Sequence, residues 1–354
     1  MRRAPVLVAV AATALLALAP AARALPHGWP HHFALGVADA PGGASALHGI
    51  DLRYQYLSGG VNTRAGWATW NPGGTFVTRY VRESRAAHLV PVLTYYQLLQ
   101  SKDSCGGDES AVDRCHLHDA ALMRAYWADF SLLLRRARGP SPVIVHLEPD
   151  LFGYLEQAGQ RARASRFARR AIALRNRLAP NVALAYHDSI WGTKEDPTYS
   201  KPSLAHMAAL GARSARFYRS LHAHFDLVFH DVADRDAGFR EKVLGDGGKS
   251  AWSDADFVRR DAYLRALRHG THRPIAIWQI PLGNSTLDQT WDHFRDNRVE
   301  YWLGSRAHLR ALRDTGVVAL LFGAGADGCT TAQTDGGVFF RLARAYERAP
   351  LRLR

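Results

Sequence analysis

The sequence predicts an α/β protein that folds as one (β/α)8 barrel of the TIM type. Eight short apolar segments alternate with longer segments of helical periodicity, which is the order of elements in such a barrel. Most of the later apolar segments are continuous, as expected for strands buried on both faces of a parallel sheet. The alternative is an open doubly wound sheet, but PGGAS at 41–45 matches the glycine-rich nucleotide loop of that fold poorly.

The expected strands are short and end at polar or glycine residues. They are Phe33–Ala38, Leu52–Leu57, Leu89–Tyr95, Val143–Leu147, Val182–Tyr186, Leu227–His230, Ile275–Ile280 and Val317–Phe322. The segments between them are amphipathic and suit helices. They are Thr78–His88, Asp119–Arg136, Ala158–Leu178, Leu204–His224, Asp254–Arg268, Ser305–Asp314 and Gly337–Arg348, with only Gly43–His48 available in the first connection.

The N-terminus has the composition of a secretory signal peptide. Two arginines precede an almost wholly apolar run at 4–20, and Ala-Arg-Ala at 22–24 fits the small-x-small cleavage rule. A membrane anchor is the alternative, but a spanning helix needs about 20 apolar residues. We therefore expect a signal peptide at residues 1–24 and one catalytic barrel domain at residues 25–354. The mature protein would be secreted, extracellular or periplasmic, and free of the membrane.

The chain is basic, with a formal net charge of +13 at pH 7. Such a charge can indicate binding to nucleic acid, to an anionic surface or to an acidic polymer. Only five of the 45 basic residues are lysines, and the arginines are spread through the helix-like segments without forming a stripe or an arm. This pattern indicates that the excess of arginine reflects the overall composition of the sequence and not a binding surface. We therefore expect no nucleic-acid partner. We also expect a monomer.

The three cysteines predict one disulfide. Cys105 and Cys115 flank the polar segment GGDESAVDR, and export would allow them to pair, while Cys329 is left over. No Cys-x-x-Cys pair is present. We therefore expect neither a metal site nor another cofactor.

Acidic residues collect at the carboxyl ends of the expected strands, where barrels of this class build their active sites. The fourth strand reads VIVHLEPDLFGYL and places Glu148 and Asp150 at the barrel mouth. Asp150 could merely cap the following helix, but burying Glu148 would be costly without a partner. The fifth and sixth strands end in His-Asp pairs, at 187–188 and 230–231. A cluster of this kind is expected to contain a group with a raised pKa.

Aromatic residues fall at or just after the same strand ends. Some of these rings are expected to be ordinary packing, but rings at a barrel mouth can also stack on the apolar faces of sugars. Aromatic residues together with acids favour a carbohydrate over a phosphate or a nucleotide. The candidate substrate-binding residues are Asp39, Tyr56, Trp67, Trp70, Tyr95, Tyr96, His187, Asp188, Trp191, His230, Trp278, Gln279 and Asp327.

Two of the expected strands resemble those of glycoside hydrolase family 6 cellulases. The stretches are VIVHLEPDLFGYL and PNVALAYHDSIWG, within residues 143–192. The resemblance implies that Asp150 is the catalytic acid, that Asp188 binds substrate, and that the reaction inverts the anomeric carbon on a modified barrel. The family's earlier Asp-rich motif has no clear counterpart, because VLTYYQLLQSKD occupies its place. We therefore expect a relative or another glycosidase barrel, not a typical cellulase.

These residues predict a hydrolase of polysaccharides or oligosaccharides that works by carboxylate acid–base catalysis. Glycosidic cleavage needs a protonated acid at the leaving oxygen and a second carboxylate on the other side of the sugar ring. Asp150 is the expected acid. Its pKa would be raised by Glu148, which is counted with it among the catalytic residues, or by Asp188, if either is ionised. Asp231 is the expected base, with Asp39 and Asp327 as alternatives.

The end of the seventh strand indicates whether the reaction retains or inverts the anomeric carbon. Many retaining barrels carry a nucleophilic glutamate at its end, but here the residue is Gln279, and an amide cannot serve that role. Inversion is therefore favoured. One alternative function is a carbohydrate-binding barrel without hydrolytic activity. A hydrolase of another kind is disfavoured, because neither Gly-x-Ser-x-Gly nor a cysteine nucleophile with a nearby base is present.

Overall fold

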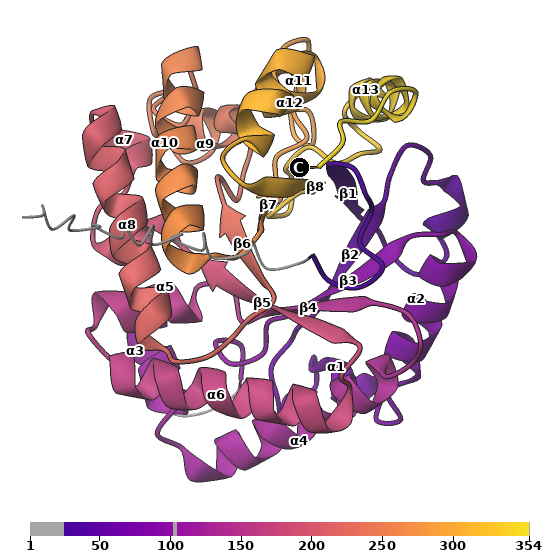
Figure 1. Cartoon of the computed structure of the whole chain (residues 1–354), viewed down its shortest axis with the longest axis vertical. Helices are drawn as coiled ribbons and strands as arrows, with labels where there is room; N and C mark the ends of the chain where they lie inside the picture. Colours follow the sequence, from indigo (N-terminus) through magenta and orange to yellow (C-terminus); the bar gives the residue numbers. More distant parts are fainter. Residues whose placement is uncertain (1–24, 102–104, 354) are drawn as a thin grey trace, which may run out of the picture.

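The structure, a computed structural model, describes residues 25–101 and 105–353. Eight parallel strands follow one another in chain order and close into a barrel, with the helices arranged around it (Figure 1). The expected (β/α)8 barrel is confirmed. The expected signal peptide lies outside the described residues, and within them no helix has the length and apolar character needed to cross a membrane.

Each expected strand is present, and the predicted ends differ from the observed ones by at most two residues. The strands are β1 (Ala34–Ala38), β2 (Leu52–Leu57), β3 (Val90–Tyr95), β4 (Val143–Leu147), β5 (Val182–Asp188), β6 (Leu227–Asp231), β7 (Ile275–Ile280) and β8 (Val317–Phe322).

The longer helices cover the outside of the barrel. They are α2 (Thr75–Ala86), α4 (Ala120–Ala137), α6 (Arg161–Leu178), α8 (Leu204–Ser220), α10 (Asp254–Thr271), α12 (Arg306–Arg313) and α13 (Val338–Glu347). The helix expected from Ala158 begins only at Arg161, because Gly159, at a φ of 66°, follows the end of a shorter helix.

Short helices occupy the loops that follow the strands, and most of them were not predicted. They are η1 (Ala44–Ala46), α1 (Trp67–Trp70), α3 (Glu109–His116), α5 (Leu151–Gln157), η2 (Ile190–Thr193), α7 (Pro197–Ser200), α9 (Ala237–Lys242) and α11 (Arg298–Leu303). As expected, the connection between β1 and β2 holds only a single short helical turn, η1.

Strand residues alternate between two apolar layers. On β5, Ala183 and Ala185 belong to the barrel interior, whereas Val182, Leu184 and Tyr186 pack beneath the surrounding helices. The alternation fixes which side chains at a strand end can point into the barrel mouth.

Large side chains from other strands fill the interior. Tyr54 of β2, Phe229 of β6 and Trp278 of β7 are buried there. His146 of β4 lies among them, with its ring centroid 4.6 Å from those of both Phe229 and Trp278. An imidazole is therefore built into the layer directly below the mouth.

The barrel closes where β1 pairs with β8, with Ala34 opposite Ala319. The segments outside these strands meet at the amino ends of the strands. The backbone N–H of Phe33 donates to the carbonyl of Leu351 at 2.7 Å, and Tyr346 donates from its hydroxyl to the carbonyl of Phe33 at 2.6 Å. The two ends of the described chain therefore lie side by side, on the face opposite the mouth.

Candidate active site

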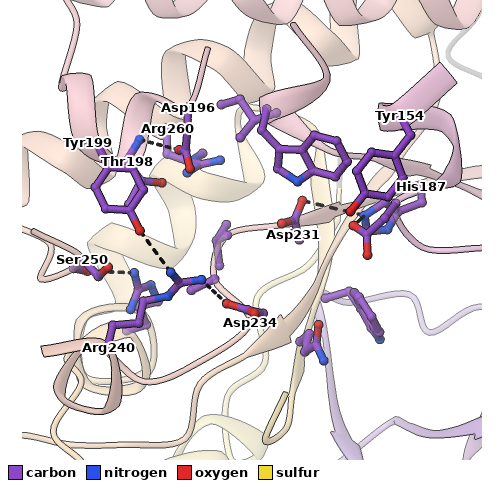
Figure 2. A pocket seen from close by; sticks show the side chains of 18 of the residues that line it. Tyr154, His187, Asp196, Thr198, Tyr199, Asp231, Asp234, Arg240, Ser250 and Arg260 are labelled. Atoms are coloured by element: carbon purple, nitrogen blue, oxygen red, sulfur yellow. Dashed lines mark hydrogen bonds and ion pairs between the residues drawn. The ribbon is translucent and has the colours of Figure 1, made fainter. Parts of the chain in front are cut away.

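A cavity of about 250 Å³ opens at the carboxyl ends of β4 to β7, the face on which barrels of this class carry their active sites. Figure 2 shows His187 and Asp231 on one side of it, and Tyr199, Arg240 and Ser250 on the other. Within residues 25–101 and 105–353, no group of His, Cys, Asp and Glu side chains is arranged to hold a metal ion.

In each of the two predicted His-Asp pairs, the alternation of strand residues places the two side chains on different sides of the barrel wall. On β5, Ala185 faces the interior, so His187 continues that row into the cavity while Asp188 points towards the helices. On β6 the same alternation places Asp231 in the cavity wall and His230 behind it. One residue of each pair lines the cavity, and the other supports the wall from outside the barrel.

Asp150 reaches the cavity because the backbone turns sharply after β4. Glu148 and Asp150, on either side of Pro149, adopt φ values of 42° and 72°, which residues other than glycine rarely occupy. Asp150 precedes α5 but makes no capping hydrogen bond with its side chain, so helix capping does not account for it. Burial, with the charges of nearby carboxylates and Asp231 first among them, raises the pKa of Asp150 to about 8. The group is therefore protonated at neutral pH.

His187 lies between the two candidate catalytic carboxylates. Its Nε2 is 3.8 Å from Oδ1 of Asp150 and 3.8 Å from Oδ1 of Asp231, and it makes no hydrogen bond. Its Nδ1 lies 2.9 Å from Nε2 of His146. Burial lowers the pKa of His187 to about 3 and also lowers the pKa of His146. Both rings are thus neutral at pH 7, and Nε2 of His187 is a buried nitrogen without a hydrogen-bond partner that lies between the two carboxylates.

A buried chain of hydrogen bonds lies behind this wall. Asp188 is 2.7 Å from Nδ1 of His230 and accepts from the Tyr263 hydroxyl at 2.9 Å. Nε2 of His230 lies 3.0 Å from Nη1 of Arg260. A guanidinium only donates, so Nε2 accepts and the imidazole proton sits on Nδ1, facing Asp188. The resemblance to family 6 implied that Asp188 binds substrate, but the structure places it outside the cavity lining, where it orients His230.

Glu148 also lies outside the cavity lining. Its carboxylate accepts the backbone N–H groups of Gln97 and Leu98, both at 3.2 Å. Burial raises its pKa to about 8. These contacts are those of a residue that anchors the loop after β3.

The end of β7 forms the floor of the cavity. Trp278 is buried, with its ring centroid 5.9 Å from that of Tyr56 and 5.7 Å from that of His187. Gln279, at a φ of 57°, donates from Nε2 to the Tyr56 hydroxyl at 2.6 Å. Its amide thus stands where many retaining barrels would present a carboxylate.

Several predicted residues pack elsewhere. Asp39 pairs with the buried Arg53 at 3.2 Å. Tyr95 and Trp67 are buried against Asp129, to which they donate at 2.9 and 2.7 Å. These side chains belong to the layer between the barrel and its helices.

The remaining predicted residues vary in exposure. Trp70 and Asp327 are exposed and do not line the cavity. Tyr96 is half-buried, and its pKa is raised by burial and by the nearby charge of Asp150. Trp191 lines the cavity, with its ring centroid 4.7 Å from that of Tyr154.

Glu109 is a cavity residue that the sequence did not single out. It begins α3, inside the loop closed by the disulfide between Cys105 and Cys115. Its carboxylate accepts a hydrogen bond from the hydroxyl of Tyr154, and both residues line the cavity. The spacing of the two cysteines was the only signal that could have drawn attention to the segment.

The wall opposite Glu109 was also missed. It comes from loops and helices after β5, β6 and β7, where strand periodicity gives no signal. It includes Asp196, Thr198, Tyr199, Asp234, Arg240, Ser250, Arg260 and Arg298.

No family model matches the sequence, and no curated protein matches it either. Solved structures do match. An endo-β-1,4-mannanase from Cellulomonas fimi has a TM-score of 0.54 at 12% identity, covering 90% of this chain and 71% of that one. A family 26 β-mannanase from Bacteroides ovatus has a TM-score of 0.55 at 12% identity, covering 90% and 89%.

A glycoside hydrolase family 5 enzyme from Prevotella bryantii, solved with a xyloglucan tetradecasaccharide, has a TM-score of 0.52 at 11% identity and covers 88% of this chain and 96% of that one. At such identities the likeness is one of fold, and it agrees with the closed eight-stranded barrel. These structures belong to families 26 and 5, so the expected relationship to family 6 receives no support from them.

Proposed function

We propose that this protein is a secreted glycoside hydrolase in which Asp150 is the general acid and Asp231 the general base. The observation that carries the proposal is the placement of both carboxylates at the cavity, each 3.8 Å from the same nitrogen of His187. Glycosidic cleavage requires two carboxyl groups that flank the scissile bond.

The surroundings of the two carboxyl groups support this division of roles. The pKa of Asp150 is raised to about 8 by burial and neighbouring carboxylates, which keeps it protonated and ready to donate. Burial also raises the pKa of Asp231, but the positive charge of Arg260 acts in the opposite direction and favours its charged form. Two carboxyl groups whose environments differ in this way suit an acid and a base.

An inverting mechanism is the one proposed. The distances of 3.8 Å from each carboxylate oxygen to the same nitrogen limit the separation of the two oxygens to 7.6 Å, a range that includes the lower part of the gap of about 6.5–9.5 Å in inverting enzymes as well as the shorter gap in retaining ones. The end of β7 offers only the amide of Gln279, so the usual nucleophile of a retaining barrel is missing. A water activated by Asp231 is the expected nucleophile.

A polysaccharide or oligosaccharide is the proposed substrate. Trp191 and Tyr154 give the cavity aromatic surfaces, and Trp278 forms its floor. The structural neighbours include mannanases and an enzyme bound to a xyloglucan oligosaccharide, which supports a glycan substrate for the same barrel. The N-terminal segment of residues 1–24 supports secretion.

The decisive experiment measures release of reducing ends from a polysaccharide panel, with the anomer first formed followed by proton NMR. We expect inversion, and we expect Asp150→Asn and Asp231→Asn to abolish release while binding persists. Asp327→Asn is the matched control, because Asp327 is exposed and lies outside the cavity lining. Binding without release in the wild type would establish the alternative, a carbohydrate-binding barrel. A retained anomer would disprove the assignment of Asp231 as base.

A further inference from the structure

We propose that the substrate carries carboxylate groups, as in a polysaccharide of uronic acids, and that Arg240 and Arg260, supported by Arg298, bind one of them. This inference rests on the proposed function, since it concerns the same cavity. The three arginines come from α9, α10 and α11 and line one side of the cavity. In Figure 2, Arg240 and Arg260 lie on the side away from His187 and Tyr154.

The main evidence for this proposal is the environment of Arg260. Its side chain is buried, and its Nη1 is held by the neutral imidazole of His230 at 3.0 Å. In the described part of the chain, no carboxylate lies within ion-pair distance of it; Asp196 and Asp231 act on its charge only from farther away. A buried cation without an anionic partner is costly, and a ligand carboxylate would supply that partner.

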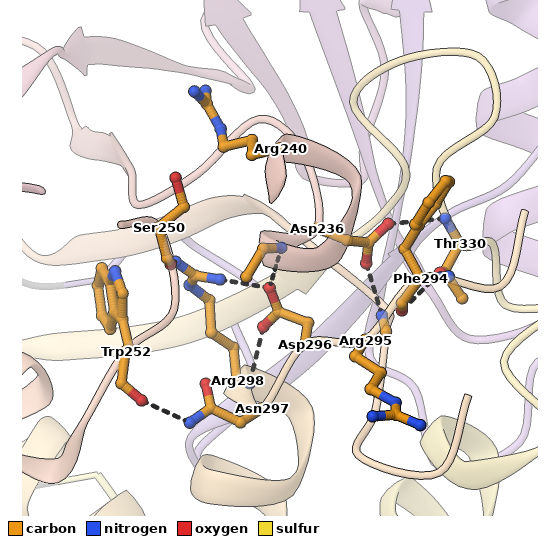
Figure 3. Close-up of polar contacts among 12 residues, drawn as sticks. Asp236, Arg240, Ser250, Trp252, Phe294, Arg295, Asp296, Asn297, Arg298 and Thr330 are labelled. Carbon is orange, nitrogen blue, oxygen red and sulfur yellow. Dashed lines mark hydrogen bonds and ion pairs between the residues drawn. The ribbon is translucent and has the colours of Figure 1, made fainter. Parts of the chain in front are cut away.

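Arg298 makes the wall rigid. It is fully buried, paired with Asp296, and donates from Nη2 to the carbonyl of Ser250 at 3.3 Å (Figure 3). Its guanidinium carbon and that of Arg260 lie 4.4 and 5.1 Å from the centre of the same Trp252 ring. The buried Nε of Arg298 makes no hydrogen bond. Both guanidinium groups are thus held close to the same aromatic ring, and a single planar guanidinium such as that of Arg260 can bind a carboxylate with two hydrogen bonds.

Arg240 completes the wall at the cavity rim. Its side chain is 23% exposed, it pairs with Asp234, and it donates to the Tyr199 hydroxyl at 3.0 Å. Asp234 also pairs with Arg235, so two guanidinium groups share one carboxylate.

The opposite wall explains how such a substrate would be oriented. Glu109 and Asp150 lie there, and an anionic substituent would be repelled from them whenever they are charged. The carboxylate group is expected at the arginine wall, with the scissile bond beside Asp150. Arg2, Arg3 and Arg23 account for three of the 13 net positive charges, so residues 25–354 carry +10, which would also attract an anionic polymer from a distance.

The test compares acidic oligosaccharides from polygalacturonate, alginate and glucuronoxylan with their carboxyl-reduced, neutral counterparts. Calorimetry on the Asp150→Asn variant measures binding without turnover. We expect at least one acidic probe to bind about tenfold more tightly than its neutral form, with an advantage that shrinks at high salt. Arg240→Gln should remove most of that advantage and leave binding of the neutral form unchanged.

Arg235→Gln is the matched control, because it removes the same charge from the same carboxylate partner without touching the cavity lining. It should change affinity by less than about twofold. Equal affinities for acidic and neutral probes, no binding of any acidic probe, or an equal loss in Arg235→Gln would each overturn the inference. Tight acidic binding without hydrolysis would refute only the proposed function, and hydrolysis restricted to neutral glycans would refute only this inference.

Discussion

Gln279 of β7 and Tyr56 of β2 are joined at the barrel mouth by a hydrogen bond of 2.6 Å from the amide Nε2 to the phenol oxygen. The bond connects β7 to β2 and fixes the orientation of an amide whose backbone is held at a positive φ of 57°. It also orients the side chain that replaces a carboxylate at this position.

Tyr56→Phe should therefore reduce kcat/KM several-fold and destabilise the fold by about 0.5–1.5 kcal/mol, because the Gln279 amide loses its acceptor. Tyr54→Phe, two residues earlier on the same strand, is the comparison. The Tyr54 hydroxyl is buried without a hydrogen-bond partner, so its removal should be neutral or stabilising. Urea unfolding and initial rates measure both effects, and equal losses in the two variants would contradict the prediction.

The pH dependence of hydrolysis should be bell-shaped. Catalysis needs Asp231 ionised and Asp150 protonated, so the rate should rise through the pKa of Asp231 and fall again near pH 8 as Asp150 loses its proton. Asp150→Asn should lower kcat about 10²–10⁴-fold on natural glycans and much less on aryl glycosides whose leaving group needs no protonation. Asp231→Asn should gain nothing from a better leaving group. Identical responses of the two variants would show that the roles are wrongly assigned.

The disulfide should matter for both stability and the acid. Replacing Cys105 and Cys115 by serine should lower the free energy of unfolding by about 2–3 kcal/mol, the chain-entropy value for a loop of this size. Release of Glu109 from the mouth should also lower the pKa of Asp150 and move the alkaline limb of the rate profile to lower pH. A reductant should move the alkaline limb of the wild-type rate profile to the position found in the variant, and it should leave the variant unchanged. A wild-type profile that does not respond to reduction would contradict this role of the disulfide.

Glu148 should make the fold less stable at high pH. Its pKa is about 8 in the folded protein against an ordinary 4.5, so folding retains a proton that the unfolded chain releases. This contribution to stability is complete below pH 4.5 and is lost as the pH rises through 8. Glu148→Gln should reduce this loss of stability with rising pH, which is measured as the urea midpoint of unfolding from pH 4 to 9. The control is Glu241→Gln, on the surface, which should leave the loss unchanged. A decline of the same slope in Glu148→Gln would exclude this group as its source.

The alternation of strand residues was visible in the sequence. It could have shown which of the predicted site residues face the barrel interior and which face the helices. The predicted strands were correct, and their interior rows continue to His187 and Asp231, whereas Asp188, His230 and Tyr95 belong to the outward rows. Treating both members of each His-Asp pair alike missed this distinction. Counting by twos from a buried alanine would have assigned each residue to one side of the sheet.

Other features could not follow from periodicity. The positive φ at Asp150 depends on how β4 ends, and Arg240, Arg260 and Arg298 reach the cavity from helices whose positions depend on the packing of three separate loops. Asp236 and Asp296 connect those loops through the backbone N–H groups of Gly283, Thr330 and Ala237 (Figure 3). Such long-range contacts leave no local pattern in the chain.

The two ends of the described chain lie side by side beneath the barrel, so either end is a suitable point for attaching the protein. Because Phe33 and Leu351 are hydrogen-bonded at the amino ends of the strands, a support or fusion partner attached near either end would present the cavity outward. Immobilised on a surface through either end, the protein should leave its mouth accessible to long, insoluble polymers. A graft in the loops after β6 or β7 would instead stand in the path of an incoming chain.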